Sequence, residues 1–202
     1  MTLLKLFSGC LVVTSLYACS VYEVKNNVDP NVVPPVGSKA DIAYADKVWR
    51  VMEAERMVGA NAAKQEPFFG GAKPHGMVLE LVYRNIKVNN HDGFIVVKKN
   101  YDGDDVSVES VTLNRSRYLS SITIMYQRES GYDEDNQNWF WAKYKPDGRL
   151  FQKTGEGKIT QLAGKIWKGK TRDQNKACIY CHSSAGGGDY IFYPDIKIPI
   201  NG

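Results

Sequence analysis

The 202-residue chain has only four cysteines and three histidines, and it lacks any block of like charge. A zinc site held by protein side chains would need a second ligand pair beside a Cys-x-x-Cys pair. Here Cys10 and Cys19 lie near the N-terminus, and His75 and His91 are single and widely separated. Because basic and acidic residues are interspersed, no basic patch indicates nucleic-acid binding. The glycine run at 186–188 is not followed by Lys-Ser or Lys-Thr, so it does not match a P-loop.

The apolar stretch at residues 6–17 is too short for an ordinary transmembrane helix. It follows a lysine and ends at Ala18, directly before Cys19, which is typical of a bacterial lipoprotein signal peptide over residues 1–18. We therefore expect an exported, periplasmic protein that is tethered to the membrane by lipidation of Cys19. An uncleaved anchor or an ordinary signal peptide is the alternative.

The rest of the chain reads as a tether followed by one domain. Residues 19–37 contain prolines and asparagines without helical periodicity, which indicates a tether. Residues 38–202 are enough for one domain with a sizeable core and too few for two. Apolar residues at helical spacing after Ser38 predict an amphipathic N-terminal helix.

Short β-rich runs separated by turn residues follow this helix. Strands are expected near residues 77–83, 94–99, 106–113, 121–127, 139–145 and 149–153. The dipeptides Asp92-Gly93 and Asp147-Gly148 are typical hairpin signals. The expected fold class is therefore α+β, mainly an antiparallel sheet with an N-terminal helix and a short C-terminal helix.

Residues Cys178-Ile179-Tyr180-Cys181-His182 match the attachment signature of c-type haem. One helical turn places thiols at i and i+3 on one side of the backbone, so both can add to the vinyl groups of a haem. We therefore expect haem c, attached at Cys178 and Cys181, with His182 as the proximal ligand of the iron. A redox-active or disulfide-linked cysteine pair is the alternative.

The position of this motif argues against an ordinary electron-carrying cytochrome. Small c-type cytochromes are helical, with the motif near the N-terminus and a methionine ligand near the C-terminus. Here the motif is at the far end of a β-rich chain. Met125 lies in an alternating strand pattern, which favours a core position over iron ligation.

Several short blocks of this chain occur in the same order as in a known family. They are Pro74-His75-Gly76, Tyr83-x-Asn85, Asp92-Gly93, Val96-Val97-Lys98-x-Asn100-Tyr101, Ile124-Met125-Tyr126, Gly131-Tyr132, Trp139-Phe140-Trp141-Ala142-Lys143-Tyr144 with Asp147-Gly148, the haem motif, and Asp189-Tyr190. From about Pro74 to Phe192 the sequence resembles the cytochrome P-460 family, which includes the cytochromes called c-prime-beta.

The resemblance implies a mainly antiparallel β fold and a five-coordinate haem iron with one open face. Family members named P-460 oxidise hydroxylamine, whereas c-prime-beta members bind nitric oxide or other small gases. The expected function is thus oxidation of hydroxylamine or a related small nitrogen compound, as an oxidoreductase. A non-enzymatic gas-binding cytochrome and a simple electron carrier are the alternatives. The resemblance also implies a homodimer and a soluble redox partner.

The resemblance further implies that Lys98 forms a covalent bond to a meso carbon of the porphyrin. Strand alternation alone does not choose between Lys98 and Lys99, because both faces of that strand are apolar. At Lys99 the family pattern more often has Glu. Phe94 shares a face with Lys98 and is our candidate for the distal pocket.

The catalytic base is not identified by any motif. Glu80, Glu109 and Asp189 are candidates because they lie in or beside matched blocks, although such residues are more typical of solvated or salt-bridged surface positions. His75 could approach the haem, but a hydrogen-bonded loop histidine is the more typical interpretation.

Overall fold

The computed structural model describes residues 36–71, 75–155, 157–166, 178–186 and 188–192. The expected signal peptide, Cys19, Pro74 and all but the last two residues of the expected tether lie outside these ranges. Within the described ranges, no helix is both long and apolar enough to span a membrane.

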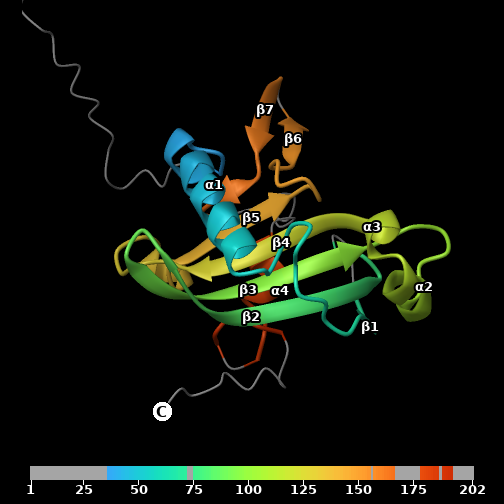
Figure 1. The fold of residues 1–202 in the computed structure, drawn as a ribbon. Coiled ribbons are helices and arrows are strands. Elements are labelled where there is room, and N and C mark those ends of the chain that lie inside the picture. Colours follow the sequence, from blue (N-terminus) through green and yellow to red (C-terminus); the bar gives the residue numbers. More distant parts are fainter. Residues whose placement is uncertain (1–35, 72–74, 156, 167–177, 187, 193–202) are drawn as a thin grey trace, which may run out of the picture. The chain divides into compact units, whose positions relative to one another are not determined.

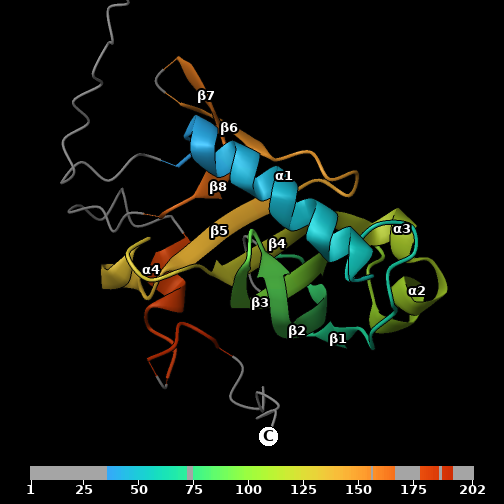
Figure 2. The ribbon, with the colours of Figure 1, turned by 60° about the vertical axis from the view of Figure 1, so that its left-hand side comes forward.

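The described residues form an α+β fold built on one six-stranded antiparallel sheet (Figures 1 and 2). The strand order is β1-β2-β3-β4-β5-β8, and β6 and β7 form a separate two-stranded sheet. The strands are β1 (Phe68–Phe69), β2 (Val78–Val88), β3 (His91–Tyr101), β4 (Leu119–Gln127), β5 (Trp139–Tyr144), β6 (Gln152–Gly155), β7 (Lys158–Gln161) and β8 (Ala163–Gly164). The helices are α1 (Lys39–Ala54), α2 (Val108–Leu113), α3 (Arg115–Tyr118), the 3-10 turn η1 (Glu134–Asn136) and α4 (Cys178–His182). The expected α+β class with a mainly antiparallel sheet is confirmed.

Helix α1 packs across one face of the sheet (Figure 1). It begins after Ser38, whose hydroxyl oxygen accepts a hydrogen bond from the backbone N–H of Asp41 (3.1 Å). The residues of α1 that are buried against the sheet include Tyr44, Ala45, Val48, Trp49 and Met52. Together with the inward side chains of β2 to β5 they form the larger hydrophobic core.

The other face of the sheet packs against α4. Successive side chains of a strand point to opposite faces, and in β3 Ile95 and Val97 belong to the core under α1. Phe94 and Val96 belong instead to a second buried cluster that contains Ile179 of α4. The two helices therefore cover opposite faces of the sheet (Figure 2). We call the face of Phe94 and Val96 the α4 face.

The strand expected at residues 106–113 is wrong, because helix α2 occupies Val108–Leu113 and α3 follows it. Ser107 and Ser110 form a capping box, in which each side chain bonds the backbone N–H of the other residue (3.1 and 2.8 Å). The capping box provides hydrogen-bond acceptors for free N–H groups at the start of the helix. This stabilisation outweighs the β propensity of Val106, Val108 and Val111.

The hairpin turn expected at Asp92-Gly93 is also misplaced, because both residues lie inside β3. The turn between β2 and β3 is formed by Asn89 and Asn90, with φ of 50° and 66°. Asparagine tolerates the left-handed backbone that a two-residue turn of this kind requires. Gly93 serves a different purpose, since a Cβ there would lie 2.1 Å from the carbonyl oxygen of Gln127. The turn at Asp147-Gly148 is confirmed, with the Gly148 N–H donating to the carbonyl of Lys145 (3.0 Å).

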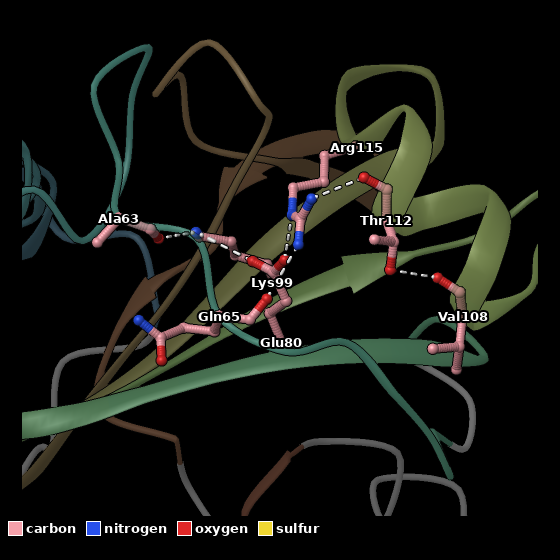
Figure 3. Close-up of polar contacts among 7 residues, drawn as sticks. All are labelled: Ala63, Gln65, Glu80, Lys99, Val108, Thr112 and Arg115. Atoms are coloured by element: carbon pink, nitrogen blue, oxygen red, sulfur yellow. Dashed lines mark hydrogen bonds and ion pairs between the residues drawn. The ribbon is translucent and has the colours of Figure 1, made fainter.

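A buried carboxylate ties the sheet to the segments beside it (Figure 3). The Glu80 side chain is fully buried, and its two oxygens bind Lys99 Nζ (3.2 Å) and Arg115 Nε (2.5 Å). Lys99 Nζ also donates to the carbonyl of Ala63, and Arg115 donates to the carbonyl of Gln65. One carboxylate therefore holds β2, β3, α3 and the loop before β1 together.

Candidate functional site

Helix α4 presents the two cysteines of the motif as free thiols. Cys178 is partly buried and Cys181 is exposed. Burial raises the pKa of the Cys178 thiol, so this side chain is protonated at neutral pH. The spacing of three residues in one helical turn places both sulfur atoms on the same side of α4.

His182, the last residue of α4, is held in one orientation by a backbone carbonyl. Its Nδ1–H donates to the carbonyl oxygen of Tyr190 (2.7 Å), and the side chain is buried. Burial lowers the pKa of His182, so the imidazole is neutral and its Nε2 carries the lone pair. The ring packs edge-on against Trp141, with centroids 5.1 Å apart, and against Phe192, with centroids 5.5 Å apart.

The sheet brings Lys98 to the same side as α4. In β3 it follows Phe94 and Val96 on the α4 face, and its cross-strand neighbours are Leu81 and Thr123. Burial lowers the pKa of Lys98, while a negative charge on Cys178 would act in the opposite direction. Its charge also lowers the pKa of His182. Lys98 therefore shares the α4 face with the side chains that pack against Ile179.

Lys99, by contrast, points to the face that α1 covers, where Glu80 binds it. Lys98 and Lys99 are consecutive residues of one strand, so their side chains point to opposite faces of the sheet. The structure therefore distinguishes the two lysines: Lys99 takes part in a buried ion pair, and Lys98 lies on the α4 face with Phe94, which is buried there.

His75 is a second imidazole on the α4 face. Its Nδ1 lies 3.0 Å from Asn100 Oδ1, and its ring centroid lies 6.3 Å from that of His182. Burial, with a smaller effect from Lys98, lowers its pKa to about 4, so His75 is neutral at pH 7. His75 is thus both a hydrogen-bonded histidine before β2 and a neighbour of α4.

Two tryptophans on β5 carry buried polar atoms without partners. The indole Nε1 atoms of Trp139 and Trp141 make no hydrogen bond within the part of the chain that the structure describes. Both side chains belong to the cluster with Ile179, beside α4. Buried donors of this kind ordinarily bond a protein group, a water molecule or a ligand. The sequence contains no signal for them, because a buried tryptophan is ordinarily part of the core.

The three candidate carboxylates do not meet at this site. Glu80 is buried on the opposite face, so the expectation of a surface group is wrong for this residue. Glu109 is exposed in the first turn of α2. Asp189 is exposed, and its carboxylate accepts a hydrogen bond from the Ile191 N–H (2.9 Å).

Taken together, the α4 face brings two free thiols, two neutral imidazoles and one desolvated amine into one region. In the described ranges no group of three or more His, Cys, Asp or Glu side chains could hold a metal ion. Comparisons with protein-family models, with curated proteins and with solved structures give no match.

Proposed function

We propose that the chain is an exported c-type haem protein of the cytochrome P-460 type, with haem bound between α4 and the α4 face of the sheet. The observation that carries the proposal is the setting of His182. Its Nδ1–H is bound to a backbone carbonyl, so that Nε2 is free, and two free thiols precede it at one-turn spacing. Metal-bound histidines typically donate their other ring N–H in this way.

The residues around α4 fit this cofactor. The buried cluster offers an apolar surface for a porphyrin, and the unpartnered indole N–H groups of Trp139 and Trp141 could donate to a polar edge of the group or its ligand. In the attachment step, each S–H of Cys178 and Cys181 adds across a vinyl double bond. A carbon–sulfur bond forms, and the hydrogen goes to the other vinyl carbon, so no oxidant is needed.

The bound haem would supply an iron that exchanges electrons with a small ligand. His182 would hold the iron from the side of α4, and Tyr190 would fix the ring through its carbonyl. Phe94 and the other buried aromatics of the α4 face would exclude water. The Lys98 amine would lie beside the porphyrin, where burial favours its neutral, nucleophilic form.

We propose hydroxylamine, or a related small nitrogen compound, as the substrate, with a soluble redox partner as electron acceptor and a homodimer as the assembly. In the purified wild-type protein with a soluble oxidant, we expect hydroxylamine to be consumed in proportion to oxidant reduced. The alternative is reversible binding of nitric oxide, which the placement of Glu80 favours, because this carboxylate is bound on the opposite face. A stable ferrous nitrosyl complex without hydroxylamine consumption would decide for gas binding.

The lysine proposal predicts a change in the absorption spectrum. A bond from Lys98 to the porphyrin should give the wild-type ferrous protein a strongly red-shifted Soret band, and Lys98→Met should restore an ordinary high-spin c-haem spectrum. Lys143→Met is the matched control. Lys143 is a partly buried lysine of β5 on the same face of the sheet, and its cross-strand neighbour is Thr123 of β4. A red-shifted band that persists in Lys98→Met would eliminate Lys98 as the cross-linking residue.

Export and lipidation complete the proposal. They follow from the segment that ends at Cys19 and are compatible with attachment of haem outside the cytoplasm. Partitioning of the mature protein into a detergent phase, and its loss in Cys19→Ala, would test the anchor. A variant that partitions like the wild type would contradict it.

A further inference from the structure

The imidazole of His182 packs against aromatic rings from different parts of the chain. The nearest described ring is that of Trp141 on β5, whose centroid lies 5.1 Å from that of His182, with the ring planes at 69°. Phe192 lies 5.5 Å away at 67°, and His75 lies 6.3 Å away at 79°. All three contacts are edge-to-face, which is a preferred arrangement of aromatic rings. The ring of His182 is therefore held by side chains as well as by its hydrogen bond at Nδ1.

Trp141 is held in place by the sheet. The backbone at Trp141 pairs with Met125 of β4 on one side and with Gly164 of β8 on the other. The residue is 5% exposed. Phe192, by contrast, is 51% exposed and lies in the segment after α4. Trp141 is thus the neighbour that connects the orientation of the imidazole to the sheet.

The hydrogen bond of His182 depends on the rotation of its ring. Nδ1–H donates to the carbonyl oxygen of Tyr190 at 2.7 Å, and such a bond weakens steeply when donor, hydrogen and acceptor depart from a straight line. An imidazole that donates a hydrogen bond at one nitrogen becomes a more basic ligand at the other. A side chain that prevents rotation of the ring therefore also controls how strongly Nε2 can bind a metal ion.

We propose that Trp141 is a positioning residue for His182: its indole keeps the Nδ1–H on the Tyr190 carbonyl, which strengthens electron donation from Nε2 to the haem iron. This inference rests on the proposed function. It leaves the iron five-coordinate, with its other face open. A more strongly donating imidazole stabilises ferric over ferrous iron, so Trp141 would keep the reduction potential of the haem low.

The iron–histidine stretching band in the resonance Raman spectrum of the ferrous protein tests the proposal without an activity measurement. In Trp141→Leu, purified with its covalent haem, we expect this band to move to lower frequency because the imidazole can rotate away from its acceptor. The reduction potential should become more positive for the same reason. Trp141→Phe keeps an aromatic ring beside the imidazole and should stay close to the wild type in both measurements.

Trp139→Leu is the matched control. Trp139 lies on the same strand and in the same buried cluster as Trp141, and its indole nitrogen likewise has no partner among the described residues. The ring contacts described for His182 do not include Trp139. We therefore expect Trp139→Leu to keep the wild-type band and potential.

Three results would overturn the assignment. The first is an unchanged band and potential in Trp141→Leu with only the free energy of unfolding lowered, which is the effect of a residue that merely fills the core. The second is an equal shift in Trp139→Leu. The third decides the matter even if Trp141→Leu does not fold: a wild-type band at the frequency of ferrous haem with a single N-methylated imidazole, which cannot donate a hydrogen bond.

The proposed function is tested separately by the same samples. Any of the three results with covalent haem present leaves the proposed function intact. A wild-type protein without covalent haem would overturn both proposals.

Discussion

Replacing both Cys178 and Cys181 by serine is expected to abolish covalent haem attachment completely. Serine is close to cysteine in size but has no thiol, so α4 keeps its shape while no carbon–sulfur bond can form. Wild-type protein, produced in cells that mature c-type cytochromes, should keep its haem after denaturation and acid–acetone extraction. The double variant should release all of it. A pyridine haemochrome spectrum and a haem-stained denaturing gel measure this directly.

The matched control for the cysteines is the double variant Ser183→Ala with Ser184→Ala. It changes two residues directly after α4 but leaves the thiols, and in the described part of the chain both hydroxyl groups donate to backbone carbonyls of this turn. We expect full haem attachment in this control. Cys178→Ser alone should retain haem through Cys181. Covalent haem in the double cysteine variant, or no haem in the wild type, would refute the attachment proposal.

Replacing Glu80 by alanine is expected to lower the free energy of unfolding by about 3–5 kcal/mol, because it leaves buried cationic partners without their carboxylate. Lys99 is only 7% exposed and Arg115 is 21% exposed, so water cannot replace the missing partner. For a domain of this size the loss corresponds to a fall in the melting temperature of about 10 °C. Urea unfolding followed by far-UV circular dichroism measures the difference.

An exposed ion pair provides the comparison for Glu80. Glu55 binds Arg84 at 2.6 Å, but their side chains are 48% and 44% exposed. We expect Glu55→Gln to lower the free energy of unfolding by less than about 1 kcal/mol. If Glu55→Gln and Glu80→Ala lowered the free energy of unfolding equally, burial of the Glu80 ion pairs would contribute nothing to stability.

The strands could be predicted from the sequence where apolar and polar residues alternate locally. Alternating residues at 94–99 and 121–127 lie within β3 and β4. The segment at 106–113 could not be predicted correctly from composition, because its helix depends on two serine side chains three residues apart. The two-residue strands β1 and β8 were not expected, since they exist only through pairing with β2 and β5.

The candidate site was predictable in its chemistry but not in its arrangement. Alternation indicated that Lys98 and Lys99 point in opposite directions, yet the partner that distinguishes them, Glu80, binds from the neighbouring strand. The proximity of His75 to His182 joins residues over a hundred positions apart. Such contacts depend on the register of the whole sheet, which no short motif contains.

The order of strands in the sheet has a consequence for how the protein folds. From β1 to β5 each strand pairs with the next one along the chain, and β2 and β3 are joined by two residues. Contacts between near neighbours in sequence close small loops, which costs little chain entropy and speeds folding. Among the described residues, the core between the sheet and α1 contains no residue of α4, which follows them in the chain. Under the proposed function, haem would thus be attached to the trailing end of a chain whose sheet can already have formed.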